Sequence, residues 1–150
     1  MRFHAGKPSR DPGRTPMPWA NEPGAGFTDP GVEPWLPLGS LDRNIADQRR
    51  DPSSILAFCR GAIALRGREP ELCAGAYETV DAGPGVWAWR RGREFAVAVN
   101  LSRRRRWVPL EGVIVLATCR EREGESGPLE LAPSEGAVVH LERPLGHPRD

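Results

Sequence analysis

The sequence lacks any apolar run of about eighteen residues or more, the length that a membrane-spanning helix requires. Its first seven residues, MRFHAGK, also lack the apolar centre of a secretory leader. We therefore expect a cytoplasmic protein with no membrane partner.

Cysteine and histidine are scarce, with three of each: Cys59, Cys73, Cys119, His4, His140 and His147. An odd number of cysteines without paired spacing argues against a disulfide framework, so we predict buried, reduced thiols. The histidines share no ligand spacing with one another or with the cysteines. The sequence therefore predicts no metal site and no cofactor.

Lysine is almost absent, and Lys7 is the only one. The formal net charge is nevertheless only +1, because 21 basic residues face 20 acidic ones. A run of four arginines, residues 103–106, precedes Trp107 and could suit a nucleic acid. Because nearby glutamates and the near-neutral balance oppose that interpretation, we favour a solvated hairpin loop and expect no nucleic-acid partner.

The length limits the architecture. A complete (β/α)8 barrel needs about 250 residues, whereas this chain has 150. With 39% hydrophobic and 27% charged residues, the composition is that of an ordinary globular domain with one modest core.

What the sequence does contain, near its start, is a long loop rich in proline and glycine. Residues 10–19 read RDPGRTPMPW, followed by GFT at residues 26–28 and PWLP at residues 34–37. Repeated proline excludes a regular helix or a central strand, and loops of specific shape often carry function. We expect extended chain, turns and one helical turn around Ile45–Arg49.

The first regular helix is expected directly after this region. Asp51 can cap it, Pro52 suits its first position, and the pattern continues to Arg66 before Gly67 permits the exit. Residues at three- and four-residue spacing define its expected apolar face: Ile55, Cys59, Ala62, Ile63 and Arg66. Gly61 interrupts the helix and suggests looser packing there.

From residue 75 onward the hydrophobic period changes to two. Seven short strands are expected, at residues 76–80, 85–91, 94–101, 106–110, 113–118, 129–131 and 137–141, with a tight hairpin at residues 91–93. Short strands at this spacing are typical of an antiparallel sandwich or Greek-key sheet. The expected fold is therefore mostly β, with an extended N-terminal loop region and one amphipathic helix followed by an antiparallel β-sandwich.

The order of these motifs resembles the C-terminal part of α-glucosidases and oligo-1,6-glucosidases of the α-amylase superfamily, glycoside hydrolase family 13. The resemblance is strongest from RDPGRTPMPW to the Leu65-Arg66 helix ending, and it includes Asn100-Leu101-Ser102 and LAPSEGAVV at residues 131–139. It implies that residues 1–70 are the tail of a (β/α)8 barrel, comprising its last loop and last helix. Residues 71–150 would then form the C-terminal antiparallel β-domain.

The resemblance also implies a sugar-binding role for the loop. In this family an arginine of the Arg-Asp-x-x-Arg loop acts at the glucose subsite, paired with a carboxylate that grips the sugar. By position in the motif this is Arg10, with Arg14 second. The alternative is that Arg10, Asp11 and Arg14 only stabilise the loop through an internal ion cluster. Trp19, Phe27 and Trp35 are expected to be apolar pegs rather than sugar-stacking rings.

A retaining glycosidase needs two carboxyl groups about 5 Å apart, and the resemblance places the family's catalytic carboxylates upstream of everything matched here. We therefore assign no catalytic residue. The chain is expected to be an α-glucosidase fragment for malto- or isomalto-oligosaccharides that is inactive alone, with the missing barrel as its partner. The alternatives are a stand-alone β-module that binds carbohydrate or a partner protein and, more weakly, a nucleic-acid-binding domain.

Overall fold

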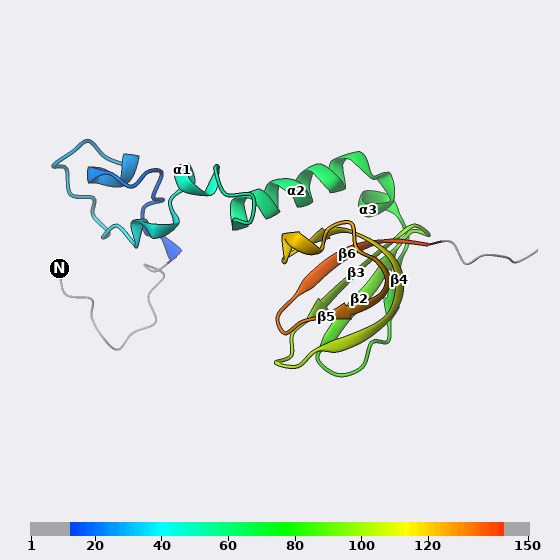
Figure 1. Ribbon diagram of the computed structural model, residues 1–150. Coiled ribbons are helices and arrows are strands. Elements are labelled where there is room, and N and C mark those ends of the chain that lie inside the picture. The colour runs from blue at the N-terminus through cyan, green and yellow to red at the C-terminus, as the bar shows by residue number, and fades with distance from the viewer. Residues whose placement is uncertain (1–12, 143–150) are drawn as a thin grey trace, which may run out of the picture. The chain divides into compact units, whose positions relative to one another are not determined.

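The computed structural model describes residues 13–142. The chain, drawn in Figure 1, divides into two compact units, one that ends at Leu56 and one that begins at Ala57. The units are described separately below. No helix within the described range is long and apolar enough to cross a membrane.

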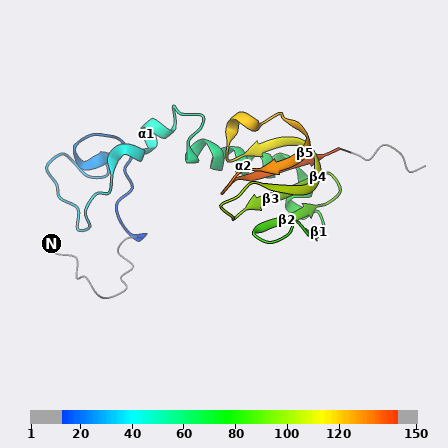
Figure 2. The same ribbon diagram turned by 60° about the horizontal axis from the view of Figure 1, so that its bottom comes forward.

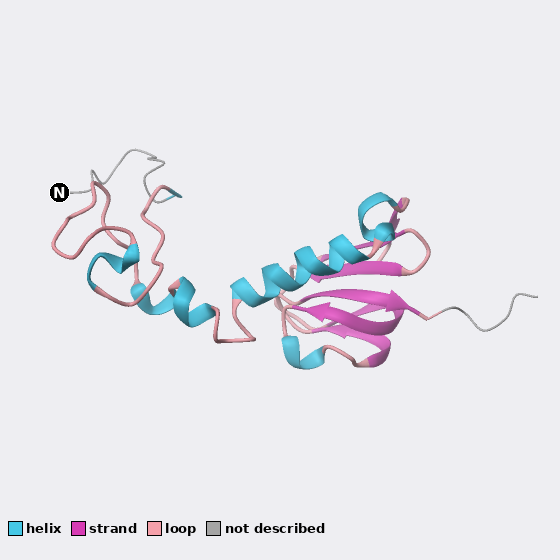
Figure 3. Cartoon of the chain, turned by 90° about the horizontal axis from the view of Figure 1, so that it is seen from above, coloured by secondary structure: helices cyan, strands magenta, loops and turns pink. Residues whose placement is uncertain are grey.

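The described part of the first unit is dominated by loop, as Figure 3 shows, and it includes the 3-10 turns Pro23–Gly26 and Leu41–Arg43 and the short helix α1, Ile45–Gln48. Asn44 caps α1 and is completely buried: its Oδ1 accepts from the Asp47 backbone N–H at 2.9 Å. The Asn44 Nδ2 donates to the carbonyl of Leu41 at 2.9 Å. A single amide side chain thus joins the second 3-10 turn to α1, and the helical turn expected around Ile45 is confirmed.

Helix α2, Ile55–Arg68, begins three residues later than expected from Pro52. The Asp51 carboxylate does not cap the helix but forms a tight turn, in which Oδ1 accepts from the Ser53 N–H at 2.8 Å and the Ser53 hydroxyl at 2.6 Å. Gln48 Oε1 accepts from the Leu56 N–H at 3.2 Å instead. The helix also continues through Gly67, and a short helix that the sequence did not predict, α3 at Pro70–Ala74, follows it.

The face that α2 buries also differs from the expected one. Leu65 is buried, and the half-buried Phe58 and Ala62 pack with it against Leu72, Phe95 and Leu116. Ile55, Cys59, Ile63 and Arg66 are exposed. Both sides of this helix are apolar, so periodicity alone could not show which side the β-domain would cover.

Gly61 marks a close approach rather than loose packing. A Cβ at this position would lie 3.1 Å from the Arg120 Nη1 and 3.2 Å from the Leu116 Cδ1. Arg120 and Leu116 both belong to the β-domain, so the missing side chain lets α2 settle closely on the sheet.

The second unit contains one antiparallel sheet of six strands, seen in Figure 2. The strands are β1 Tyr77–Val80, β2 Val86–Arg91, β3 Phe95–Asn100, β4 Arg106–Ala117, β5 Ser126–Leu131 and β6 Gly136–Leu141. Their order across the sheet is β1-β2-β3-β6-β4-β5. The mostly β, antiparallel fold is therefore confirmed, and so is the hairpin at Gly92, whose φ is +63°.

Two predicted strands, 106–110 and 113–118, are one long strand, β4. The interruption that suggested a turn at Glu111 and Gly112 is a register shift in the pairing with β5. Gly112 has a φ of +158°, and a Cβ there would collide with the carbonyl of His140 on β6. Gly112, whose sequence context predicted a turn, thus allows the backbones of two paired strands, β4 and β6, to approach closely.

The main core lies on one side of the sheet. It consists of alternating residues of the strands, among them Ala88, Ala98, Leu131 and Val139, each no more than 1% exposed. The smaller cluster beneath α2 and α3 lies on the other side, around Phe95. The sheet of the second unit thus has the main core on one side and the helices α2 and α3 on the other.

We expect opposite effects from changing two glycines of α2. Gly67→Ala should raise the free energy of unfolding by about 0.5–1 kcal/mol, since glycine is a poor helix residue and nothing lies within 4 Å of this position. Gly61→Leu should lower it by about 1–3 kcal/mol, because the larger side chain would push α2 from the sheet. Urea unfolding followed by tryptophan fluorescence measures both. Equal effects at the two positions would contradict the close approach at Gly61.

Candidate functional site

Of the two arginines predicted at the sugar, Arg10 lies outside the described residues. Arg14 is described and exposed, and no ion pair or hydrogen bond joins it to another residue of the range 13–142. The fork of donors on an exposed guanidinium suits a carboxylate.

The loop that follows Arg14 has a well-defined backbone. The N–H groups of Trp19 and Ala20 both donate to the carbonyl of Ala25, at 2.8 and 3.2 Å. Ala25 is completely buried and has a φ of +54°, a left-handed conformation that is uncommon for alanine. Further on, the Ile45 N–H donates to the carbonyl of Pro18 at 3.0 Å, which fastens the loop to the start of α1.

This held backbone presents its large side chains outward. Trp19 and Phe27 are about half exposed, and Trp35 is 79% exposed. They are therefore not pegs inside the first unit; whether they pack on a barrel stays a prediction. Such exposure of three aromatic rings favours recognition of another surface or ligand.

A hollow of about 670 Å³ opens beside the 3-10 turn Pro23–Gly26. Two carboxylates, Glu22 and Asp29, line it together with Phe27, Thr28 and Val32. The Thr28 hydroxyl donates to the carbonyl of Val32 at 3.0 Å and closes the turn beneath it.

The second unit contains a buried polar cluster where two sequence motifs meet. Asn100 is completely buried, and its Nδ2 donates to the carbonyls of Arg104, Leu131 and Ala132. Its backbone N–H donates to the carbonyl of Glu135 at 2.8 Å. Asn100 thus joins the two motifs that marked the resemblance, residues 100–102 and residues 131–139.

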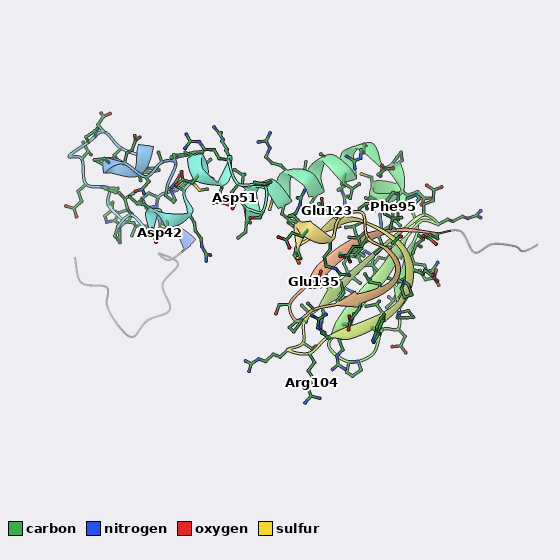
Figure 4. The ribbon with its side chains drawn as sticks, in the orientation of Figure 1. Asp42, Asp51, Phe95, Arg104, Glu123 and Glu135 are labelled. Carbon is green, nitrogen blue, oxygen red and sulfur yellow. The ribbon has the colours of Figure 1, made fainter. Side chains whose placement is uncertain are left out.

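Glu135, labelled in Figure 4, is only 4% exposed and is the most buried carboxylate of the described range. It accepts from Arg122 Nη1 at 2.9 Å and from the Ala132 N–H at 2.6 Å. Partial burial lowers the pKa of Arg122, but hydrogen bonds and charges of Glu125 and Glu135 outweigh it, so the pKa is raised overall. This pair could not be predicted from the sequence, because the spacing of residues 122 and 135 matches no local pattern that brings two side chains together.

A second hollow, of about 710 Å³, lies beside this pair. Its lining includes Arg105, Cys119, Glu130 and Ser134. All buried side-chain oxygen and nitrogen atoms of residues 13–142 have hydrogen-bond partners. The Arg122–Glu135 pair is therefore a satisfied structural element rather than a pair waiting for a ligand.

Residues 1–75 match the family described as α-amylase, catalytic domain. The chain belongs to the α-amylase family. The catalytic-domain match includes the loop, α2 and α3, whereas the β-sheet lies beyond it.

Curated relatives of this α-amylase-family chain agree. It is 33% identical over 140 residues to an alpha-glucosidase of Pediococcus pentosaceus, covering 89% of this chain and 25% of the relative. It is 40% identical over 101 residues to trehalose-6-phosphate hydrolase of Escherichia coli, covering 63% of this chain and 18% of the relative. The chain thus spans about a quarter or less of the length of these relatives.

Solved structures extend the match through the sheet. Isomaltulose synthase from Klebsiella sp. LX3 superposes with a TM-score of 0.77 and 28% identity, covering 89% of this chain and 26% of that one. Trehalulose synthase MutB from Pseudomonas mesoacidophila superposes with a TM-score of 0.76 and 27% identity, over the same shares. The arrangement of loop, helix and antiparallel sheet is therefore that of the family.

The prediction that the thiols of this α-amylase-family chain are buried is wrong. Cys59, Cys73 and Cys119 are free and exposed. Cys59 lies on the uncovered side of α2, and the Cys73 thiol lies 3.1 Å from the carbonyl of Arg66. No group of three metal-ligand side chains gathers in the part of the chain that the structure describes.

The arginine run forms the loop between β3 and β4. Arg103, Arg104 and Arg105 are exposed, and Arg105 pairs with Glu130 at 3.4 Å. The loop is solvated, as the sequence favoured, but it is not a hairpin, because β6 lies between β3 and β4 in the sheet.

The buried ion pair Arg122–Glu135 should contribute far more to the free energy of unfolding than the exposed pair Arg105–Glu130. Glu135→Gln should lower the free energy of unfolding by about 3 kcal/mol, because Arg122 would lose its buried counter-charge. The control Glu130→Gln removes the exposed pair with Arg105 and should cost no more than about 1 kcal/mol. Urea unfolding of the two variants tests this difference, and similar values would show that the Glu135 cluster is dispensable.

The Asp51 turn should respond to acid. Hydrogen bonds from the Ser53 hydroxyl, and then from its N–H, hold the pKa of Asp51 below its ordinary value. Because the folded pKa is lowered, the contribution of the turn is complete above about pH 4 and is lost as the pH falls through the folded value. Ser53→Ala should move the midpoint of Asp51 upward in a carboxyl NMR titration. An unchanged midpoint would contradict the role of the hydroxyl.

Proposed function

We propose that this chain is the C-terminal part of an α-glucosidase-type glycoside hydrolase. It would supply the last loop and last helix of the catalytic barrel, residues 1–70, and the C-terminal β-domain, residues 71–150. The observation that supports this most is the catalytic-domain match over residues 1–75, which ends just before β1.

The loop would contribute to sugar binding rather than to bond cleavage. Arg10, with Arg14 second, would hold a carboxylate that grips the sugar, a task that suits a guanidinium because it binds bidentately and keeps its charge. The exposure of Arg14 and of three aromatic side chains on a fastened backbone supports a recognition surface.

The reaction of the complete enzyme would be hydrolysis of α-glucosidic bonds in malto- or isomalto-oligosaccharides with retention of configuration. This chemistry needs a nucleophilic carboxylate and an acid–base carboxylate, and no residue of this chain is assigned to either role. The relatives are named for different sugars, so we propose the class of bond and not one substrate. A cytoplasmic location is part of the same proposal.

The purified chain alone should not hydrolyse an aryl α-glucoside above background, because the two catalytic carboxylates would be supplied by other residues. The assay is release of the coloured aryl alcohol, with the complete Pediococcus pentosaceus alpha-glucosidase as positive control. Turnover by this chain that survives repeated purification would overturn the assignment of catalysis to missing residues.

The second candidate is a β-module that binds carbohydrate or a protein by itself. It is favoured by one observation: the second unit has its own core and satisfied buried polar groups. Titration with maltose under tryptophan fluorescence tests its carbohydrate form. A saturable change at millimolar sugar would favour this candidate over the α-glucosidase fragment.

A further inference from the structure

The arginine-rich loop between β3 and β4 has a fixed backbone. Asn100 Nδ2 donates to the carbonyl of Arg104 at 2.8 Å, and Asn100 Oδ1 accepts from the Ser102 N–H at 3.0 Å. The Leu101 N–H donates to the carbonyl of Gly85, just before β2, at 2.8 Å. Because Asn100 is completely buried, these bonds fix the loop to the interior of the unit. A ligand that binds the loop therefore has little backbone to order.

The guanidinium groups of this loop are unevenly paired. Arg105 pairs with Glu130 at 3.4 Å. Arg103 and Arg104 are exposed, and their side chains make no ion pair or hydrogen bond within residues 13–142. Figure 4 shows Arg104 pointing away from the sheet. Two neighbouring positive charges repel each other, so an anion that contacts both is favoured.

The glutamates that follow β4 do not neutralise these arginines. Glu123 pairs with Arg120 and Glu125 pairs with Arg122, each at 2.8 Å. Of the glutamates at positions 121, 123 and 125, only Glu121 is without an ion pair among the described residues. The expectation of no nucleic-acid partner relied partly on nearby glutamates, and two of them are occupied by other arginines.

An exposed aromatic ring lies beside the loop. Trp107, the second residue of β4, is 67% exposed and stands directly opposite Glu130 on β5. Residues in this arrangement have Cβ atoms about 5 Å apart. Since Glu130 also pairs with Arg105, the indole ring and that guanidinium group both lie beside one carboxylate. Arg103, Arg104, Arg105 and Trp107 are called the arginine–tryptophan surface below.

The chemistry of this surface favours a single-stranded nucleic acid. A guanidinium fork binds phosphate oxygens and keeps its charge, and an exposed indole face can stack on an unpaired base. A duplex keeps its bases stacked on one another and would use only the charges. An uncharged oligosaccharide would use only the ring and would leave Arg103 and Arg104 without a counter-charge.

We propose that the arginine–tryptophan surface binds single-stranded nucleic acid, with Arg103 and Arg104 on backbone phosphates and Trp107 stacked on a base. Such contacts are tolerant of sequence, because every nucleotide carries a phosphate and every base has an aromatic face. The surface lies in the second unit, beyond the catalytic-domain match at residues 1–75, so this activity does not depend on the proposed hydrolysis.

The charge contacts are tested by fluorescence polarisation of a labelled oligodeoxythymidine of about 15 nucleotides, titrated with the full chain. Saturable micromolar binding is expected at about 50 mM salt. Arg103→Gln/Arg104→Gln should weaken it and reduce the slope of log affinity against log salt by about 1.4, the value for two phosphate contacts on a single strand. The matched control is Arg60→Gln/Arg66→Gln, which removes the same charge from exposed positions of α2 and should bind like wild type.

The stacking contact is tested in the same assay. Trp107→Ala should lower the affinity about tenfold, the typical effect of losing one base–aromatic stack, and should leave the salt slope unchanged. Trp87→Ala is the matched control, because Trp87 is also an exposed tryptophan of the sheet but lies on β2. It should bind like wild type.

Binding that is absent up to about 100 µM chain at the lower salt concentration would overturn the proposal. Equal losses in the loop variant and its α2 control would also overturn it, since they would show attraction to overall charge alone. Wild-type affinity in Trp107→Ala, or equal competition by duplex DNA or inorganic polyphosphate, would reduce the surface to an anion site and contradict a single-stranded ligand. No glucoside is hydrolysed in this assay, so each of these results leaves the proposed glycosidase function unaffected.

Discussion

The fold of the second unit depends on the buried contacts of Glu135 with Arg122, Ala132 and the strand end at Asn100. Asn100 ties the end of β3 to the end of β5, and the carbonyl of Glu135 accepts from its N–H. Arg122, between β4 and β5, neutralises the Glu135 carboxylate. A charge buried this deeply is tolerated only when its partners are complete, so three separate chain reversals must assemble together.

Helix α2 connects the catalytic-domain match to the β-domain. Its packing side is fitted to the sheet through Leu65, Ala62 and the close approach at Gly61, while Ile63 remains open. A helix with apolar residues on two sides can lie between two bodies, whereas a surface helix needs only one apolar side.

Much of the architecture could be predicted from local pattern. The alternation of hydrophobic residues with a period of two predicted the antiparallel sheet. The prolines of RDPGRTPMPW predicted a loop of specific shape, and the order of the motifs indicated the family. The errors arose where one local pattern permits two structures. Asp51 and Pro52 look like a helix start, but Asp51 is used by Ser53. Gly112 looks like a turn, but it lies inside β4 where another backbone approaches.

The sequence by itself determined the lineage and the predominance of β-structure, because these follow from motif order and hydrophobic periodicity. Only the tertiary structure decided which side of α2 is buried, that the cysteines are exposed, and that Arg122 neutralises Glu135. Burial and ion pairing depend on segments distant in the chain, and no local pattern encodes which of several apolar surfaces a neighbour will cover. The ring contacts of Trp89 with Tyr77 and Trp87 likewise depend on how β1 and β2 pair.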